Sequence, residues 1–491
     1  MILSVLAQIR QTARAGDILR AWRMFESAGL LASQAPDALS LKGRLLKDRG
    51  LRSLGDERRQ LLDQAQAAYM QAAGERRATY PLINAATIAL LNGKTQEASL
   101  VATRVLELLE SGDHEPETRY WIGATAAEGH LLLGNTEASR TALELAIAAA
   151  PEAWEDHAVT LRQFRQILER IGAPSDLFDH LRPPPSLYFS GIIGLPGDEN
   201  EIREKVGVLL DDIRPGAVFG ALAAGSDIVI AEMAQARGAR LNIVLPLSLP
   251  AFRHISVSQY GGDWAERFDR LIEAADLVET LDRTNCLSAP AILNGSRVAM
   301  GLALRRSRML ATRAIALHVG RETDRIAQAE AEWRAQGLEI HDLTLDYSVP
   351  ASGAGFGRAV DRTVLASTRP LPPCSDPSVG APELTEEGFS ILRFGDPVMA
   401  MDHAAAILHM APESRLGFDC RPCAPESGVE EDAELAIVLA RAAPAGSICA
   451  PWPQIAVIDL LAPDYRFEAA GDIVTPLGDF AIGLFRLLSS A

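Results

Sequence analysis

The stretch from Gly220 to Pro246 constrains the fold more than any other part of the chain. The small-residue loop at its start lets a backbone approach a ligand closely, because glycine has no Cβ. Ser226 and Asp227 then occupy N-cap positions of a predicted helix, which Gly238 ends. The continuous apolar run 241–245 predicts a strand buried on both faces. The sequence therefore predicts a parallel α/β sheet, with a helix N-terminus whose N–H groups suit an anion.

Strand and helix signals alternate on both sides of this stretch. Strands are predicted at 187–193, 216–219, 276–280, 314–318 and 339–343, and helices at 201–213, 264–274, 292–307 and 324–336. Such alternation is typical of βαβ units, which place ligands at the carboxyl ends of the strands.

The residues of the same stretch also form a longer pattern. It reads Gly-x-x-Ala-x-Gly-Ser-Asp-Ile-x-x-Ala-Glu-x-Ala-x-x-x-Gly, then a strand ending in Leu-Pro, and continues through the segments 251–257, 264–268 and 296–303. As a run, this resembles the SLOG superfamily, Rossmann-like nucleotide-ligand domains related to the "lonely guy" phosphoribohydrolases. The resemblance covers residues 186–347 and implies a nucleotide-derived ligand.

Eight residues are candidate ligand contacts of this SLOG-like domain. They lie in the first predicted strand or in the loops around the predicted helix 226–237 and the strand 241–245: Ser190, Gly191, Gly220, Gly225, Ser226, Asp227, Pro246 and Arg253. The guanidinium of Arg253 follows the strand ending near Pro246 and can meet a phosphate there. Asp227 would repel a phosphate, unless it binds ribose hydroxyls or caps the helix.

The related phosphoribohydrolases use a Gly-Gly-x-Gly-Thr-x-x-Glu run to hold phosphate and supply a catalytic glutamate. The corresponding run here lacks the double glycine, and its Glu232 is offset. Glu232 or Asp227 would be the catalytic residue if the domain cleaved an N-glycosidic bond. Otherwise Glu232 bonds within the fold, which the altered run favours.

Residues 1–182 carry helical periodicity and almost no strand signal. The segments 89–98 and 131–138 echo each other, each with a helix end, a glycine turn, and a new helix that opens with Thr and Glu. A fainter copy surrounds Gly16. The two clear copies lie farther apart than the ~34 residues of one unit, so they resemble tetratricopeptide (TPR) repeats imperfectly. Such repeats expose a concave face to a protein partner, or serve only as a scaffold.

The triple proline at 183–185 predicts the first domain boundary. The Gly-, Pro- and Ser-rich segment 348–385 is predicted as a linker or the eroded first part of a further domain. Residues 386–491 resemble the later half of a class III adenylate/guanylate cyclase domain, on the segments 388–394 and 396–408.

That resemblance implies two metal-binding carboxylates and a transition-state pair, most of which are missing. No acid follows the strand 363–368, and Glu387 stands where the second Asp belongs. Ile437 replaces the expected Asn, Arg441 is retained, and the purine-recognising Lys near 476–478 is absent. We expect a pseudo-cyclase with no metal site and no cofactor, which pairs into a homo- or hetero-oligomer because cyclase domains act as dimers.

Composition narrows the function classes. A net charge of −17 and a pI near 5.1 argue against binding to nucleic acid or anionic membranes. No run of about 18 apolar residues predicts a transmembrane helix, and the apolar start, 1–7, is predicted as a first helix. The scattered five cysteines indicate a reducing cytoplasm.

The predicted fold class is multidomain: an all-α TPR-like repeat, then an α/β Rossmann-like parallel sheet, then an α+β degenerate cyclase-like domain. The favoured function is a non-enzymatic sensor that binds a nucleotide-derived ligand in the SLOG-like domain and a protein partner through the other two. The alternatives are an N-glycosidic-bond hydrolase acting on a nucleotide or NAD-like substrate, and a ligand-free scaffold.

Overall fold

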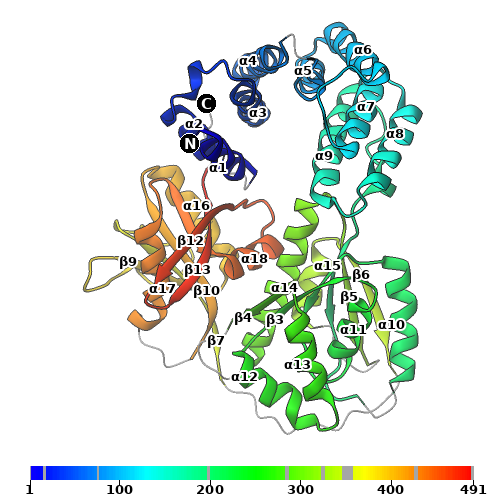
Figure 1. Cartoon of the computed structure of the whole chain (residues 1–491). Helices are drawn as coiled ribbons and strands as arrows, with labels where there is room; N and C mark the ends of the chain where they lie inside the picture. The colour runs from blue at the N-terminus through cyan, green and yellow to red at the C-terminus, as the bar shows by residue number, and fades with distance from the viewer. Residues whose placement is uncertain are drawn as a thin grey trace. The chain divides into compact units, whose positions relative to one another are not determined.

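A computed structural model describes residues 2–14, 18–74, 77–195, 199–281, 287–321, 327–345, 358–424 and 429–487. The chain divides into two compact units, Met1–Pro183 and Pro184–Ser490, which we call the helical unit and the sheet unit (Figure 1). The boundary falls within the triple proline.

The described part of the helical unit has no strand. Its α-helices are α1 (Ile2–Arg14), α2 (Ile18–Ser27), α3 (Pro36–Arg52), α4 (Gly55–Ala73), α5 (Thr79–Leu91), α6 (Thr95–Ser111), α7 (Arg119–Leu132), α8 (Thr136–Ala149) and α9 (Trp154–Ile171). The pairs α3 and α4, α5 and α6, and α7 and α8 pack as consecutive hairpins, and α9 packs on α5 and α7. This confirms the predicted all-helical repeat.

The two echoing segments form the same turn. Gly93 and Gly134 both have left-handed backbone conformations, with φ of 85° and 79°. The N–H that follows each glycine donates to a carbonyl five residues back, Lys94 to Ala89 at 2.8 Å and Asn135 to His130 at 2.9 Å. Helices α6 and α8 then open at Thr95 and Thr136, as predicted. The fainter copy at Gly16 lies outside the described residues.

The first sheet of the sheet unit is parallel and six-stranded, in the order β4-β3-β2-β1-β5-β6. Its strands are β1 (Ser186–Ser190), β2 (Ala217–Gly220), β3 (Arg240–Leu245), β4 (Leu277–Thr280), β5 (Ala314–Gly320) and β6 (Glu339–Thr344). Every strand predicted for this domain is present, although the first ends at Ser190, earlier than predicted.

Helices cover both faces of this sheet because its strands alternate two buried sets of apolar side chains (Figure 1). On β1, Leu187 and Phe189 face α10 (Asn200–Ile213), α11 (Ser226–Gln235) and α13 (Trp264–Ala274). Tyr188 faces the other side, with α14 (Ala289–Met309) and α15 (Gln328–Ala335).

The start of α11 differs from the prediction. Gly225 is the N-cap residue, with φ of 122°, and Ser226 is already the first helical residue. The Ser226 hydroxyl accepts the Ile192 N–H at 3.1 Å instead of capping the helix. Asp227 likewise turns away from the helix and accepts the Ala223 N–H at 3.2 Å. The N-cap prediction was wrong because these side chains bind neighbouring loops.

The second sheet is mixed, in the order β12-β13-β11-β10-β7-β9-β8. Its elements are β7 (Val360–Ser367), β8 (Glu383–Leu384), β9 (Ser390–Phe394), α16 (Pro397–Met410), β10 (Arg415–Cys423), α17 (Val429–Ala442), β11 (Ser447–Pro451), α18 (Trp452–Leu461), β12 (Glu468–Thr475) and β13 (Gly478–Phe485). The segment 348–385 thus contributes β7, which pairs with both β9 and β10, and the short edge strand β8.

The two sheets share one apolar core through α14 and α18. That cluster holds Tyr188 and Phe219 of the first sheet and Phe418 and Ile448 of the second. At the contact, a Cβ on Gly301 would lie 1.9 Å from the Ala456 carbonyl oxygen. Only glycine allows the two helices to approach so closely.

Candidate functional site

The strand order places a topological switch point between β1 and β5. From β1 the chain adds β2, β3 and β4 on one side, and β5 and β6 on the other. In open α/β sheets, ligands bind outside the carboxyl ends of the strands at this point. Ser190 ends β1 there and pairs in register with His318 of β5.

Three polar side chains meet at the switch point: Ser190, His318 and Glu330, which we call the switch-point cluster. The Ser190 Oγ lies 2.9 Å from His318 Nδ1 and 2.9 Å from Glu330 Oε1. The His318 Nδ1 and Glu330 Oε1 are 3.6 Å apart. The His318 side chain is 25% exposed, so the cluster reaches the surface, whereas that of Glu330 is 5% exposed. The buried Oε2 of Glu330 has no hydrogen-bond partner in the described part of the chain.

Tyr188 extends this polar group toward α14. Burial raises the pKa of its phenol, and the charge of Glu330 raises it further, while hydrogen bonds with Ser296 and Ser190 act in the opposite direction. Tyr188 therefore stays protonated and links the switch-point cluster to the first half of α14.

The loop after β1 runs across the start of α11. The Ser226 N–H donates to the Ile192 carbonyl at 3.0 Å, and the Gly194 N–H donates to the Ala224 carbonyl at 2.7 Å. The protein itself thereby satisfies the first N–H of α11, the group predicted to meet an anion.

The three glycines that were predicted to contact a ligand pack against protein atoms. A Cβ on Gly191 would lie 2.4 Å from the Ser226 Cβ, one on Gly225 2.5 Å from the Ile192 carbonyl oxygen, and one on Gly220 2.6 Å from the Phe189 carbonyl oxygen. These glycines hold the loops together, which differs from the predicted approach of a ligand.

Asp227 lies beneath these loops and is only 7% exposed. Its Oδ1 has no hydrogen-bond partner among the described residues, and burial raises its pKa from 3.8 to about 8. The N–H groups of Ala223 and Gly191 act in the opposite direction and lower this pKa. The Gly191 N–H nevertheless leaves Oδ1 without a hydrogen bond. Asp227 is therefore mainly protonated at neutral pH.

Stability is expected to fall as the pH rises from about 4 to about 8, because the folded Asp227 keeps a proton that the unfolded chain releases. Asp227→Asn removes this dependence. We expect the free energy of unfolding of the variant, relative to wild type, to rise by about 1–4 kcal/mol between pH 5 and pH 8. Urea titrations at both pH values measure it, with the exposed Asp211→Asn as control. Parallel pH profiles of wild type and Asp227→Asn would contradict this assignment.

Pro246 and Arg253 lie in other surroundings. Pro246 is buried and faces Gly295 of α14, where a Cβ would lie 3.4 Å away. Arg253 forms a double hydrogen bond with Asp269 of α13, at 2.7 and 2.8 Å. The positive charge of Arg253 is therefore already paired with a carboxylate of the protein.

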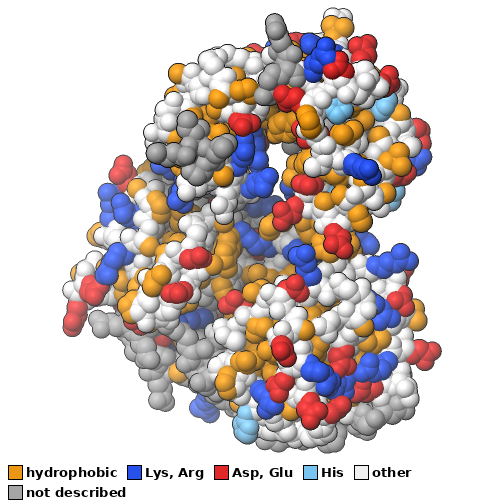
Figure 2. Space-filling view, viewed as in Figure 1, with side chains coloured by type: hydrophobic (Ala, Val, Ile, Leu, Met, Phe, Trp, Pro, Cys, Tyr) orange, Lys and Arg blue, Asp and Glu red, His pale blue; other side chains and the backbone are white. Residues whose placement is uncertain are grey.

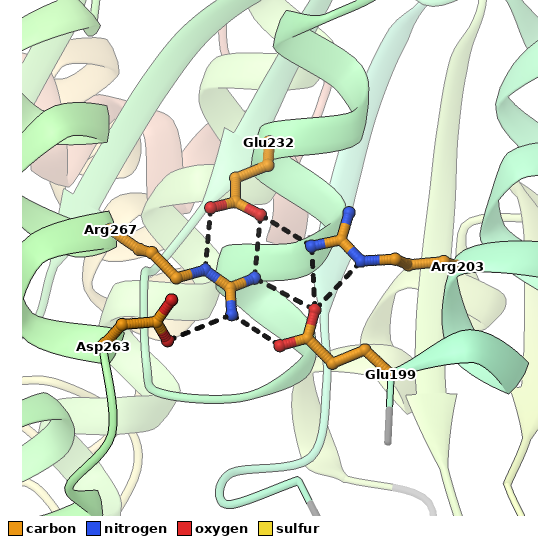
Figure 3. Close-up of polar contacts among 5 residues, drawn as sticks. All are labelled: Glu199, Arg203, Glu232, Asp263 and Arg267. Carbon is orange, nitrogen blue, oxygen red and sulfur yellow. Dashed lines mark hydrogen bonds and ion pairs between the residues drawn. The ribbon is translucent and has the colours of Figure 1, made fainter. Parts of the chain in front are cut away.

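Glu232 belongs to an ion-pair network between α10, α11 and α13 (Figure 3). Its two carboxylate oxygens each accept from Arg267 at 2.8 Å, and Arg203 adds a contact at 3.0 Å. Arg267 also pairs with Glu199, at the start of α10. The network fixes Glu199, and with it the end of the loop after β1, to α11 and α13.

An open crevice of about 500 Å³ lies beside this network, between α11 and α13. Its lining includes Glu232 and Arg267, which already pair with each other. We therefore place the candidate site at the switch point, where buried polar atoms lack partners. Side chains of both charges lie interspersed over the visible surface of the first-sheet part (Figure 2).

In the second sheet, Glu387 and Arg441, the two positions that were compared with a cyclase site, lie together. Glu387 pairs with Arg441 at 2.7 Å, and both side chains are more than half exposed. Among the described residues, no group of three or more His, Cys, Asp or Glu side chains is arranged to hold a metal ion.

Sequence reasoning missed His318 and Glu330. The strand 314–318 was predicted, so the rule that ligands bind at carboxyl ends could have selected His318. Glu330 carried no comparable signal, because its helix reaches the switch point only through the fold.

The helical unit has a counterpart among known families. Residues 3–90 match the family model described as Tetratricopeptide Repeats-Sensor. This part is a TPR-like repeat. The match ends before α6, and the sheet unit lies outside it.

Comparisons of the whole chain add little. A solved structure of an O-GlcNAc transferase mutant from Thermobaculum terrenum matches 70% of this chain and 74% of its own, at 15% identity and a TM-score of 0.20. That score is too low to support an argument about fold or function. No curated protein matches the chain. None of the helices in the described ranges is long and apolar enough to cross a membrane.

Proposed function

We propose that this protein is a non-enzymatic sensor. It binds a nucleotide-derived ligand at the switch point of the first sheet and a protein partner through its TPR-like repeat. The observation that carries the proposal is the switch-point cluster, in which a partly exposed His318 adjoins a buried carboxyl with an unpartnered oxygen. Convergent polar groups at such a point favour a small-molecule site.

The repeat supports the second half of the proposal. TPR-like hairpins stack into arrays whose extended surfaces bind protein segments. The description of the matching family includes the word sensor, which agrees with this role. A pseudo-cyclase part that pairs with another subunit adds a second protein contact to the proposal.

Helix α14 is the element that can relay ligand binding. It starts near the carboxyl ends of the first-sheet strands, where Ser296 forms a hydrogen bond with Tyr188. Its later turns pack on α18 of the second sheet. There Arg305 and Arg308 both pair with the buried Asp459. A shift of α14 on ligand binding would therefore move the second sheet.

The hydrolase alternative gains no support from the candidate residues. Both carboxylate oxygens of Glu232 accept hydrogen bonds from Arg267, so they are already occupied within the fold. Asp227 is buried under the loop after β1. The scaffold alternative is an outcome of the following test.

We expect nucleotides, cyclic nucleotides, NAD or ADP-ribose to raise the melting temperature of the protein without being converted. Ligand at a hundred times its dissociation constant adds about 2.7 kcal/mol to the free energy of unfolding. His318→Ala should abolish the shift. His341→Ala should retain it, because His341 is a similarly part-exposed histidine that pairs with Glu339 on β6. Thermal shift with product analysis of the same samples measures both effects.

Each other outcome opposes the proposal. Turnover of any compound would make the protein an enzyme, and no shift with any compound would leave the scaffold. A shift that survives His318→Ala would place the ligand elsewhere.

A further inference from the structure

The hydrogen bonds of the switch-point cluster fix the tautomer of His318. The Ser190 hydroxyl has one proton, and an ionised Glu330 can only accept, so Ser190 donates to Oε1 at 2.9 Å. The His318 Nδ1 lies 2.9 Å from the Ser190 Oγ, so Nδ1 must then donate its proton to that oxygen. A neutral His318 therefore carries its proton on Nδ1, and its Nε2 is an acceptor.

Two acceptor atoms remain in the cluster without a partner among the described residues. They are the Nε2 of His318 and the buried Oε2 of Glu330. A buried acceptor without a partner is costly, so a ligand that donates to it gains affinity. A phosphate presents only acceptors to this carboxylate and would be repelled by it.

We propose that the switch-point cluster binds the vicinal hydroxyls of a ribose, with His318 and Glu330 as acceptors and Ser190 as the positioning residue between them. The inference rests on the proposed function. It adds that the sugar of the ligand lies beside β5. Carboxylates serve ribose hydroxyls in the same way in other dinucleotide-binding sheets, although from a different strand. Here the acid comes from α15, on the other side of the switch point.

The charges around the switch-point cluster are compatible with an uncharged hydrogen-bond donor such as a ribose hydroxyl. Tyr188 is protonated, Asp227 is mainly protonated at neutral pH, and the nearby Glu332 is paired with Arg297 at 2.6 Å. The carboxylate of Glu330 is thus the local charge that the ligand meets from α15.

The test compares ADP and GDP with their 2′-deoxy and 2′,3′-dideoxy forms by calorimetric titration of the full chain. We expect at least one parent nucleotide to bind and each lost hydroxyl to weaken its binding about tenfold to hundredfold, the span of one hydrogen bond to a charged group. Glu330→Gln should remove most of that discrimination, while the surface variant Glu339→Gln should keep it.

The two proposals fail differently. Equal binding of ribo and dideoxy forms would overturn the ribose assignment and leave the sensor standing. If neither ADP nor GDP binds, the ribose assignment is overturned for these nucleotides. The thermal-shift series of nucleotides, cyclic nucleotides, NAD and ADP-ribose then decides whether the sensor proposal stands. Ring ¹⁵N spectra give a test without ligand, because the His318 signal, identified by its loss in His318→Gln, should show Nδ1–H at pH 8. An Nε2–H signal would overturn the assignment.

Discussion

Arg267→Met is expected to lower the free energy of unfolding by about 3 kcal/mol, the lower end of the cost of removing one partner from a buried charge pair. Arg267 is 5% exposed and lies between the carboxylates of Glu199 and Glu232. Its loss leaves both carboxylates with Arg203 as their shared cation. The value lies at the lower end because each carboxylate side chain is about a fifth exposed.

The matched control is Arg237→Met, which breaks an exposed pair with Asp211 and should cost about 1 kcal/mol or less. Urea denaturation of the three proteins, followed by tryptophan fluorescence, measures the difference, because Trp264 lies 4.3 Å from the Arg267 guanidinium. Equal losses in the two variants would mean that the network is only a surface ion pair. A larger loss for Arg267→Met supports its role in fixing the loop after β1.

Gly301→Ala is expected to destabilise the sheet unit by about 2 kcal/mol or more. Alanine normally stabilises a helix interior by about 1 kcal/mol relative to glycine, so the sign of the stability change alone tests the close approach of the two helices. The new Cβ would lie 1.9 Å from the Ala456 carbonyl oxygen, and backbone atoms cannot yield as a flexible side chain can. The two helices must move apart, which loosens the core shared by both sheets.

Gly295→Ala on the same helix is the control. Its Cβ would lie 3.4 Å from the nearest atom of Pro246, an ordinary contact, so this variant should be neutral or more stable. Denaturation midpoints of both variants give the comparison. If Gly301→Ala were also stabilising, α14 and α18 would not be packed as described.

Local patterns determined much of the architecture. The glycine turns at 93 and 134 were predictable because a left-handed residue after a helix depends on few neighbours. The apolar run 241–245 gave a buried strand for a similar reason, since continuous hydrophobicity has few other solutions in a parallel sheet. The TPR-like and α/β character of the chain thus follow from sequence alone.

Side-chain partners were determined only by the tertiary structure. Ser226 and Asp227 suit an N-cap by type, yet the loops packed on them offered N–H groups that they bind instead. Glu232 suits a catalytic role by position, but two arginines from other helices neutralise it. Such outcomes depend on residues distant in sequence, which local propensity does not reach.

The candidate site itself shows the same division. The sequence placed Ser190 within the first predicted strand, and the strand rule pointed to the carboxyl edge of the sheet. Only the strand order brought His318 beside Ser190, and only the packing of α15 brought Glu330 to both. Sequence determined which elements form, because hydrophobic periodicity is local. The tertiary structure decided which polar groups meet, because a hydrogen bond requires an approach within about 3 Å that chain topology alone provides.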